Sequence, residues 1–167
     1  MQESVEVITT HINADFDALA SLIAASKLYP GASLVFPGSQ EKNLRNFFLH
    51  STSYLFNFSK MKQIKFDRIK RLILVDTRQK SRIGKFAELV DRDDVEIHIY
   101  DHHPKSADDI AASLVVNEKY GSTTTILTLI IKERSIELTK DETTFMKAVL
   151  YEDNGFVSYP SSCAADY

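Results

Sequence analysis

Three short motifs combine histidine and aspartate at spacings that can bind metal ions. They are His11-Ile-Asn-Ala-Asp15-Phe-Asp17, then Asp76 followed by Thr77 and Arg78, and finally Asp101-His102-His103. From average residue usage, a pattern like the first arises by chance in about one chain in a hundred of this size. Carboxylates and imidazoles that share one cleft repel each other or lose hydration unless a cation organises them. Together the motifs predict a metal site.

The candidate ligands are more numerous than one ion needs. Mixed His and Asp ligands suit a borderline-hard divalent ion, so Mn²⁺ is the expected metal, with Mg²⁺, Co²⁺ or Zn²⁺ as alternatives. Two ions about 3.5–4 Å apart, bridged by one carboxylate, make a water that bridges them nucleophilic at neutral pH. This arrangement is suited to in-line attack on phosphorus, so the expected chemistry is hydrolysis of a phosphate ester or anhydride.

Each motif follows a predicted strand. Apolar runs predict strands over 5–10, 33–36, 72–75, 95–100 and 113–116. Helices are predicted over 14–28, 41–49, 82–90, 121–132 and 140–152, and an irregular segment over 51–70. The alternation predicts the α/β class, with a mostly parallel, Rossmann-like sheet and helices on both faces. Because ligands bind outside the carboxyl ends of the strands in such sheets, the three motifs are expected to converge on one crevice.

The composition predicts a single globular domain over 1–167. Hydrophobic residues make up 44% of the chain and charged residues 26%, as in soluble domains. The single cysteine, Cys163, excludes an intramolecular disulfide framework, and no apolar run is long enough for a bilayer, so a cytoplasmic setting is expected. The net charge of −3 does not exclude nucleic acid as a partner, because bound cations neutralise an acidic cluster.

The motifs resemble those of the DHH phosphoesterase superfamily. The three motifs above match in order, and Tyr151-Glu-Asp153-Asn-Gly155 resembles the fourth family motif. The first motif departs mildly, with Ala14 where members often have Pro and Ala20 where they often have Gly. Members include manganese inorganic pyrophosphatases, exopolyphosphatases, RecJ-type single-strand exonucleases and nanoRNases. The resemblance therefore implies a phosphoesterase that depends on divalent metal ions.

The resemblance also implies two sets of metal ligands. The first ion would be held by His11, Asp15 and Asp76. The second ion would be held by Asp17, Asp76, His102 and Asp153. Asp76 belongs to both sets and would bridge the two ions.

Further residues around these ligands receive supporting or catalytic roles from the same resemblance. Asp101 and Asn13 would contact the ligands rather than the ions. Asp101 would orient a histidine ligand by accepting a hydrogen bond from the imidazole nitrogen that does not bind the metal. Asp76 and His103 are the expected catalytic residues, and His103 would contact the scissile phosphate or assist the leaving group.

Two more segments could contact a phosphate. Arg78, Lys80 and Arg82 follow the second motif closely, and their alternative reading is a solvated loop and helix start. The segment 121–124, Gly-Ser-Thr-Thr, opens a predicted helix and could present backbone N–H groups to an anion. The alternative there is an ordinary capped helix start.

The residues around the motifs narrow the resemblance to one branch of the superfamily. The segments 36–43 and 75–79 are similar to a branch in which a DHH domain is fused to CBS domains and a tRNA nucleotidyltransferase or poly(A) polymerase-like module. Complete members carry a second domain after the fourth motif, so we expect this chain to be an N-terminal fragment. Without that closing domain the site stays wet, and the isolated fragment is expected to be weakly active or inactive.

Two functions are consistent with these observations. The first is hydrolysis of a phosphodiester or phosphoanhydride by a hydroxide that bridges two metals; the substrate would be an oligoribonucleotide, a nucleotide phosphate or polyphosphate. The alternative is a nucleotide- or RNA-binding regulatory module of a nucleotidyltransferase. The expected partners are a phosphate-containing small molecule or short RNA and the further domains of the same polypeptide. No membrane partner is expected.

Overall fold

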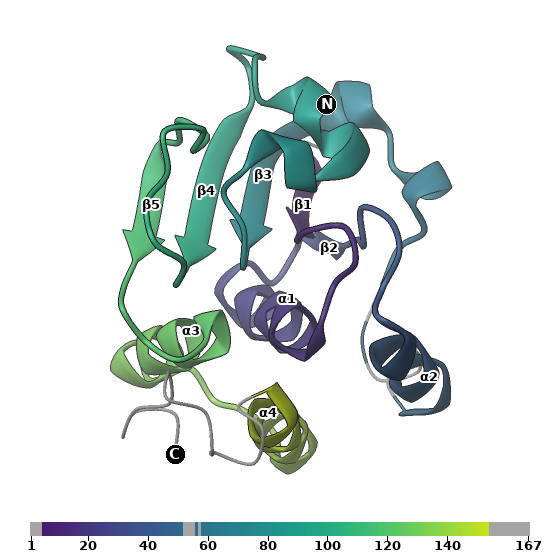
Figure 1. Ribbon diagram of the computed structural model, residues 1–167, viewed down its shortest axis with the longest axis vertical. Helices are drawn as coiled ribbons and strands as arrows, with labels where there is room; N and C mark the ends of the chain where they lie inside the picture. Colours follow the sequence, from purple (N-terminus) through teal and green to yellow (C-terminus); the bar gives the residue numbers. More distant parts are fainter. Residues whose placement is uncertain (1–4, 52–55, 57, 154–167) are drawn as a thin grey trace.

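The computed structural model describes residues 5–51, 56 and 58–153. Its centre is a sheet of five parallel strands in the order β2-β1-β3-β4-β5 (Figure 1). The strands are β1 (Val5–Thr9), β2 (Ser33–Leu34), β3 (Ile69–Val75), β4 (Glu96–Asp101) and β5 (Leu114–Asn117). The predicted α/β class with a parallel sheet is therefore confirmed, although β2 is shorter than the strand expected over 33–36.

Helical segments cover both faces of this sheet. The α-helices are α1 (Phe16–Leu28), α2 (Lys42–Ser51), α3 (Thr123–Glu133) and α4 (Lys140–Asp153). α1 contacts the sheet, α3 and α4, and these three helices lie together on one side in Figure 1. The core on the opposite face includes side chains of the 3-10 helices Met61–Gln63, Phe66–Arg68 and Gly84–Leu89. None of the described helices is long and apolar enough to cross a membrane.

The side chains of β3 belong to both halves of the core. Leu72 and Leu74 pack in the cluster that contains Phe86, whereas Ile73 packs in the cluster that contains Leu22 of α1. All five side chains are fully buried. A central parallel strand is buried on both faces, and this explains the unbroken apolar run that predicted the strand.

The helix predicted over 82–90 is present as 3-10 turns rather than as a continuous α-helix. This segment contains part of the 3-10 helix Lys80–Arg82 and all of the 3-10 helix Gly84–Leu89. Gly84 has a φ of 55°, a left-handed conformation that interrupts a right-handed α-helix. A Cβ atom at this position would lie 2.9 Å from the carbonyl oxygen of Pro37. The close approach of the two loops therefore requires glycine here.

The strand order reverses between β1 and β3. From β1 the chain passes through α1 to β2 on one side, while β3, β4 and β5 follow on the other side. β1 and β3 are direct neighbours, with Ile8 opposite Ile73. Such a reversal opens a crevice at the carboxyl ends of the two strands. The segments that follow β1 and β3 therefore meet at the same edge of the sheet, next to the end of β4.

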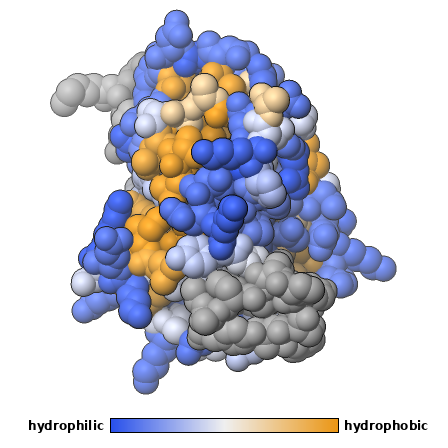
Figure 2. Space-filling view, turned by 60° about the vertical axis from the view of Figure 1, so that its left-hand side comes forward, coloured by the Kyte–Doolittle hydropathy of each residue, from blue (hydrophilic) through white to orange (hydrophobic). Residues whose placement is uncertain are grey.

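The β5 side of the molecule carries apolar surface. β5 is one of the two edge strands of the described sheet, and Val115 on it is exposed. A groove between β5 and α3 is lined in part by Leu114, Val116 and Ile130. Figure 2 turns this side forward and shows apolar patches interrupted by hydrophilic side chains. The groove is separate from the three motifs at the carboxyl edge.

Candidate metal centre

The first motif leaves β1 at the carboxyl edge of the sheet. The Thr10 hydroxyl donates to the Val75 carbonyl oxygen at 2.9 Å and ties this loop to the end of β3. His11 is buried, and its Nδ1–H donates to the carbonyl oxygen of Ile12 at 3.0 Å. The free lone pair of the ring is therefore on Nε2, which lies 3.3 Å from Asp76 Oδ2. The motif presents a bare imidazole nitrogen to a carboxylate.

Asp15 lies beside His11 because it caps α1. Its Oδ1 accepts a hydrogen bond from the Ala18 N–H at 2.9 Å, and its Oδ2 lies 3.8 Å from His11 Nε2. Two residues earlier, Asn13 has a φ of 60°, a left-handed conformation that asparagine tolerates better than most residues. Its side chain is exposed and makes no hydrogen bond with any described residue, so the supporting role of Asn13 stays a prediction.

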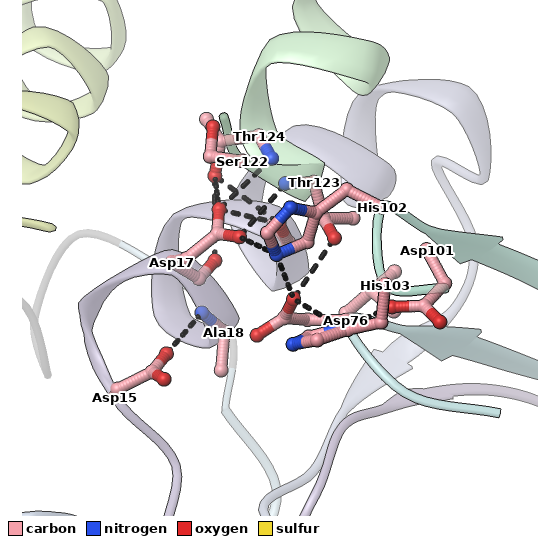
Figure 3. A network of polar contacts seen from close by, with 12 residues as sticks. Asp15, Asp17, Ala18, Asp76, Asp101, His102, His103, Ser122, Thr123 and Thr124 are labelled. Atoms are coloured by element: carbon pink, nitrogen blue, oxygen red, sulfur yellow. Dashed lines mark hydrogen bonds and ion pairs between the residues drawn. The ribbon is translucent and has the colours of Figure 1, made fainter. Parts of the chain in front are cut away.

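Asp76 occupies the centre of the cluster (Figure 3). It is 2% exposed, and its backbone, with a φ of 59°, donates an N–H bond to the Tyr100 carbonyl oxygen at 2.9 Å. Its Oδ1 accepts a hydrogen bond from the Thr123 hydroxyl at 2.9 Å. Burial raises the pKa of the Asp76 carboxyl well above its ordinary value, and the negative charges of Asp17 and Asp15 raise it further. The fold alone therefore does not stabilise the ionised form of Asp76.

His102 approaches Asp76 in the same way as His11, but from the end of β4. Its Nδ1–H donates to the carbonyl oxygen of Tyr120 at 3.1 Å. Its Nε2 therefore carries the lone pair, and it lies 3.6 Å from Asp76 Oδ1 and 3.8 Å from Asp17 Oδ2. Two imidazoles thus flank one carboxylate, each with its proton directed away from it.

This donor set fits divalent cations. Nδ1 of His11 and Nδ1 of His102 each donate to a carbonyl oxygen, so the Nε2 lone pair of each ring faces a carboxylate oxygen. Two such acceptors repel each other unless a proton or a cation lies between them. Histidines that ligate metals commonly donate their second nitrogen to a backbone carbonyl in this manner. Candidate ligand atoms lie within 4.8 Å of one another in two groups: His11, Asp15 and Asp76, and Asp76, His102 and His103. The second group contains His103 where the predicted set has Asp17, which lies 3.8 Å from His102. Asp76 belongs to both groups, as a bridging ligand must.

Asp17, a predicted ligand of the second ion, contacts the start of α3. Its Oδ2 accepts the Thr123 N–H at 2.7 Å, and its Oδ1 accepts the Thr124 N–H at 2.9 Å and the Thr124 hydroxyl at 2.6 Å. The helix start over 121–124 thus presents its backbone N–H groups to an anion of the protein itself, the side chain of Asp17. Ser122 caps the same helix by accepting the Thr125 N–H at 3.1 Å, so the capped helix start is also present.

Asp153 completes the predicted ligand set of the second ion. It is the last residue of α4, but its side chain lies outside the part of the chain that the structure describes. Its role as a ligand stays a prediction.

His103 and Asp101 form a hydrogen-bonded pair next to Asp76. His103 Nδ1–H donates to Asp101 Oδ1 at 2.7 Å, and this hydrogen bond raises the pKa of the imidazole above its ordinary value. Nδ1 of His103 also lies 3.8 Å from Asp76 Oδ1, but its proton is already committed to Asp101. The His103 side chain is 44% exposed. This leaves Nε2 as the nitrogen of His103 that can contact a substrate.

Arg78 is buried rather than open to solvent. Its side chain is 4% exposed, and its Nε lies 3.2 Å from Asp101 Oδ2 and 3.1 Å from Asp109 Oδ2. It also donates to the carbonyl oxygen of His103. Of the three basic residues predicted to contact phosphate, Arg78 is therefore the one that supports the Asp101–His103 pair. Its neighbours Lys80 and Arg82 belong to the 3-10 helix Lys80–Arg82; Lys80 is 47% exposed, whereas Arg82 is half-buried.

Comparisons with known proteins identify the family. Residues 6–151 match the model of the DHH family, N-terminal domain. The chain belongs to the DHH family. The resemblance inferred from the motifs is thereby confirmed, and the family is metal-dependent, in agreement with the donor set.

Relatives of this DHH domain are much longer proteins. The chain is 50% identical over 163 residues to an A-adding tRNA nucleotidyltransferase of Geobacter sulfurreducens, and 29% identical over 161 residues to one of Aquifex aeolicus. It spans 18% of the length of either relative. Both belong to the class of protein expected for the predicted branch. An exopolyphosphatase-related protein from Bacteroides fragilis shares the fold, with a TM-score of 0.74 and 16% identity over 98% of this chain and 50% of that one.

The predicted ligand set of the DHH domain did not include the start of α3. Thr123 contacts both acidic groups, since its hydroxyl donates to Asp76 and its N–H to Asp17. The Gly-Ser-Thr-Thr sequence at 121–124 signalled an anion site, but sequence did not identify which anion it would bind. In the folded domain this helix start fixes the orientation of the carboxylate shared by both ligand groups.

Thr123→Val is expected to weaken metal binding about tenfold. The variant removes the hydroxyl that orients Asp76, and such supporting partners typically contribute 10–100-fold to metal affinity, roughly. Isothermal titration with Mn²⁺ measures the change. Thr128→Val is the matched control on α3, because the Thr128 hydroxyl is buried without a hydrogen-bond partner among the described residues. Equal Mn²⁺ affinities of the two variants would contradict the role given to Thr123.

Proposed function

We propose that this DHH domain hydrolyses a phosphodiester or phosphoanhydride with the help of two divalent ions. The observation that carries the proposal is the position of Asp76, buried between the bare Nε2 atoms of His11 and His102. His11, Asp15 and Asp76 would hold one ion, and Asp17, Asp76, His102 and Asp153 the other. The bound ions would supply positive charge that polarises the phosphoryl group and activates the attacking water.

The protein side chains around this centre have separate tasks. Arg78 holds Asp101, and Asp101 holds the imidazole of His103 through Nδ1. His103 Nε2 then faces the substrate as a hydrogen-bond donor to a phosphoryl oxygen or as the acid that protonates the leaving group. The left-handed backbone at Asp76 and the hydroxyl of Thr123 keep the shared carboxylate in one orientation. A preorganised site of this kind lowers the barrier because it needs little rearrangement during the reaction.

A substrate panel with Mn²⁺ tests the proposal. The panel consists of a chromogenic phosphodiester, pyrophosphate, polyphosphate and a short oligoribonucleotide. Hydrolysis of at least one of them is expected from a protein that carries this domain together with its closing domain, and weaker hydrolysis from this domain alone. The activity should be lost on chelation and recovered when Mn²⁺ is restored. His102→Gln should remove the activity, whereas the matched control His98→Gln should keep it, because His98 pairs with Tyr29 and Glu96 away from the centre. Hydrolysis that survives chelation, or an active His102→Gln variant, would refute the proposal.

The second candidate function is a regulatory module that binds nucleotide or RNA without hydrolysing it. It is favoured by the names of the two curated relatives, which are tRNA nucleotidyltransferases of which this chain spans 18%. The same panel separates the candidates. Saturable binding of an oligoribonucleotide in Mn²⁺ with no product after prolonged incubation would favour the regulatory module.

A further inference from the structure

The basic residues after β3 differ in whether the protein neutralises their charge. Lys80 is 47% exposed and forms an ion pair with Asp91 at 2.5 Å. Arg78 is buried against Asp101 and Asp109. The positive charges of both residues are therefore matched by carboxylates of the protein itself.

Arg82 is different because nothing in the described part of the chain neutralises it. Its side chain is half-buried, and it makes no hydrogen bond or ion pair with any described residue. Partial burial of a charged group without a partner is unfavourable, and an anion that bound there would remove this penalty. The loop after β3 therefore carries one uncompensated guanidinium.

Arg82 and His103 line the same cavity, which has a volume of about 230 Å³. It lies between the loops that follow β3 and β4, and its other lining residues are Thr77, Arg78, Gln79, Asp101, Pro104 and Asp109. Both carboxylates in this set pair with Arg78, although the second oxygen of Asp109 is buried without a hydrogen-bond partner among the described residues. Arg82 is therefore the cation at the cavity that no described carboxylate pairs with. A water molecule takes roughly 30 Å³ in the liquid, so the cavity has room for a phosphate group.

The cavity adjoins the metal centre. His103 is the residue that links them, since it lines the cavity while its Nδ1 lies 3.8 Å from Asp76 Oδ1. A phosphorus atom bound at Asp76 would therefore have the cavity as a neighbour on the His103 side.

We propose that this cavity binds a second phosphate group of the substrate, adjacent to the scissile one, with Arg82 as its main contact. The proposal rests on the proposed hydrolytic function, which it makes more specific. A guanidinium recognises phosphate through two parallel N–H bonds, a geometry that lysine cannot reproduce. Substrates with neighbouring phosphates, such as a 5′-phosphorylated dinucleotide or polyphosphate, are therefore favoured over an isolated diester.

A binding experiment tests the cavity without any hydrolysis. Inorganic phosphate is titrated into the metal-free protein while the Arg82 Nε–Hε signal is followed by NMR. A saturable shift of this signal is expected. In Arg82→Gln, phosphate affinity should fall about tenfold, as loss of a charge-assisted hydrogen-bond pair implies. Lys80→Gln is the matched control and should bind phosphate like the wild type. No shift at Arg82, or equal affinities of Arg82→Gln and Lys80→Gln, would overturn the proposal.

A kinetic comparison then tests the specificity. The ratio of kcat/KM for pApA to that for ApA should fall about tenfold in Arg82→Gln, stay at the wild-type value in Lys80→Gln, and lie in between for Arg82→Lys. An unchanged ratio in Arg82→Gln would overturn the specificity. If neither dinucleotide is hydrolysed while other members of the substrate panel are, the dinucleotide preference is wrong. If the whole panel fails, the hydrolytic function is wrong, and the phosphate titration still decides whether the cavity binds anions.

Discussion

Asp76→Asn is expected to remove metal-dependent hydrolysis and, in the metal-free protein, to raise the free energy of unfolding. Residues that only support a metal ligand typically raise metal affinity or activity by roughly 10–100-fold. Loss of the ligand shared by both ions should therefore lower the activity by more than about a hundredfold. The amide can still accept from the Thr123 hydroxyl and can donate to the bare Nε2 of His11. Exchanging a buried anion for a satisfied neutral group should stabilise the metal-free fold by about 1–3 kcal/mol.

The pH dependence of stability gives a second measurement on the same variant. Because the pKa of Asp76 is raised on folding, the folded state holds a proton at pH values at which the unfolded chain has lost it. The free energy of unfolding of the metal-free wild type therefore falls as pH rises from the ordinary aspartate pKa to the raised value. In Asp76→Asn the free energy of unfolding should not fall in this way as pH rises. Urea unfolding in chelator across the acid to neutral range measures both curves.

Asparagine is the informative replacement at this position. Alanine would remove the side chain, but it would also place a residue that disfavours positive φ at a backbone φ of 59°. Asparagine tolerates that conformation, so changes in activity can be assigned to the lost charge. Asp91→Asn is the matched control, since Asp91 is exposed and pairs only with Lys80 among the described residues. An Asp76→Asn variant that binds two ions and turns over normally would contradict the assignment of Asp76.

Arg78→Met is expected to destabilise the protein by about 3–5 kcal/mol. It leaves Asp101, which is fully buried, without the cation that neutralises it, and removal of one partner of a buried ion pair typically has a cost of this size. Arg78→Lys should recover only part of the loss, because an ammonium cannot contact Asp101, Asp109 and the His103 carbonyl in the same geometry. Urea unfolding at neutral pH measures the change.

Arg92→Met provides the comparison for this variant. Arg92 pairs with Asp94 at 2.8 Å on the surface, where solvent screens the ion pair, so its loss should change the free energy of unfolding far less than Arg78→Met does. A double variant of Arg78→Met and Asp101→Asn should be more stable than Arg78→Met alone, because the uncompensated charge is then absent. If Arg78→Met and Arg92→Met prove equally stable, Arg78 does not hold the buried carboxylate in solution.

The sheet and the convergence of the motifs could be predicted because both follow from local patterns. The apolar run at 72–75 indicates a strand buried on both faces, and the rule for carboxyl ends of parallel strands brings His11 and Asp76 to one edge. The structure places their side chains 3.3 Å apart. The ligand roles themselves stay predictions.

Other features depend on contacts that no local pattern encodes. Arg78 follows the second motif as an ordinary loop residue would, and its burial depends on Asp109, far along the chain. Asp17 and Thr124 are 107 residues apart, so the partner of the helix start was not apparent from either segment. The 3-10 helix at Gly84–Leu89 arises from the left-handed conformation of Gly84 beside Pro37, a tertiary contact that overrides the helical pattern over 82–90.

The reversal of strand order between β1 and β3 has a consequence for the life of the protein in the cell. It builds the ligand cluster from segments such as those of His11 and Asp76, which are 65 residues apart, so an unfolded chain offers no comparable group of donors. An ion that binds only the native state adds about 2.7 kcal/mol at a concentration a hundredfold above its Kd, a large share of the stability of a typical domain. Scarcity of the ion would therefore increase the unfolded fraction that proteases remove, and the abundance of the protein would follow the supply of metal.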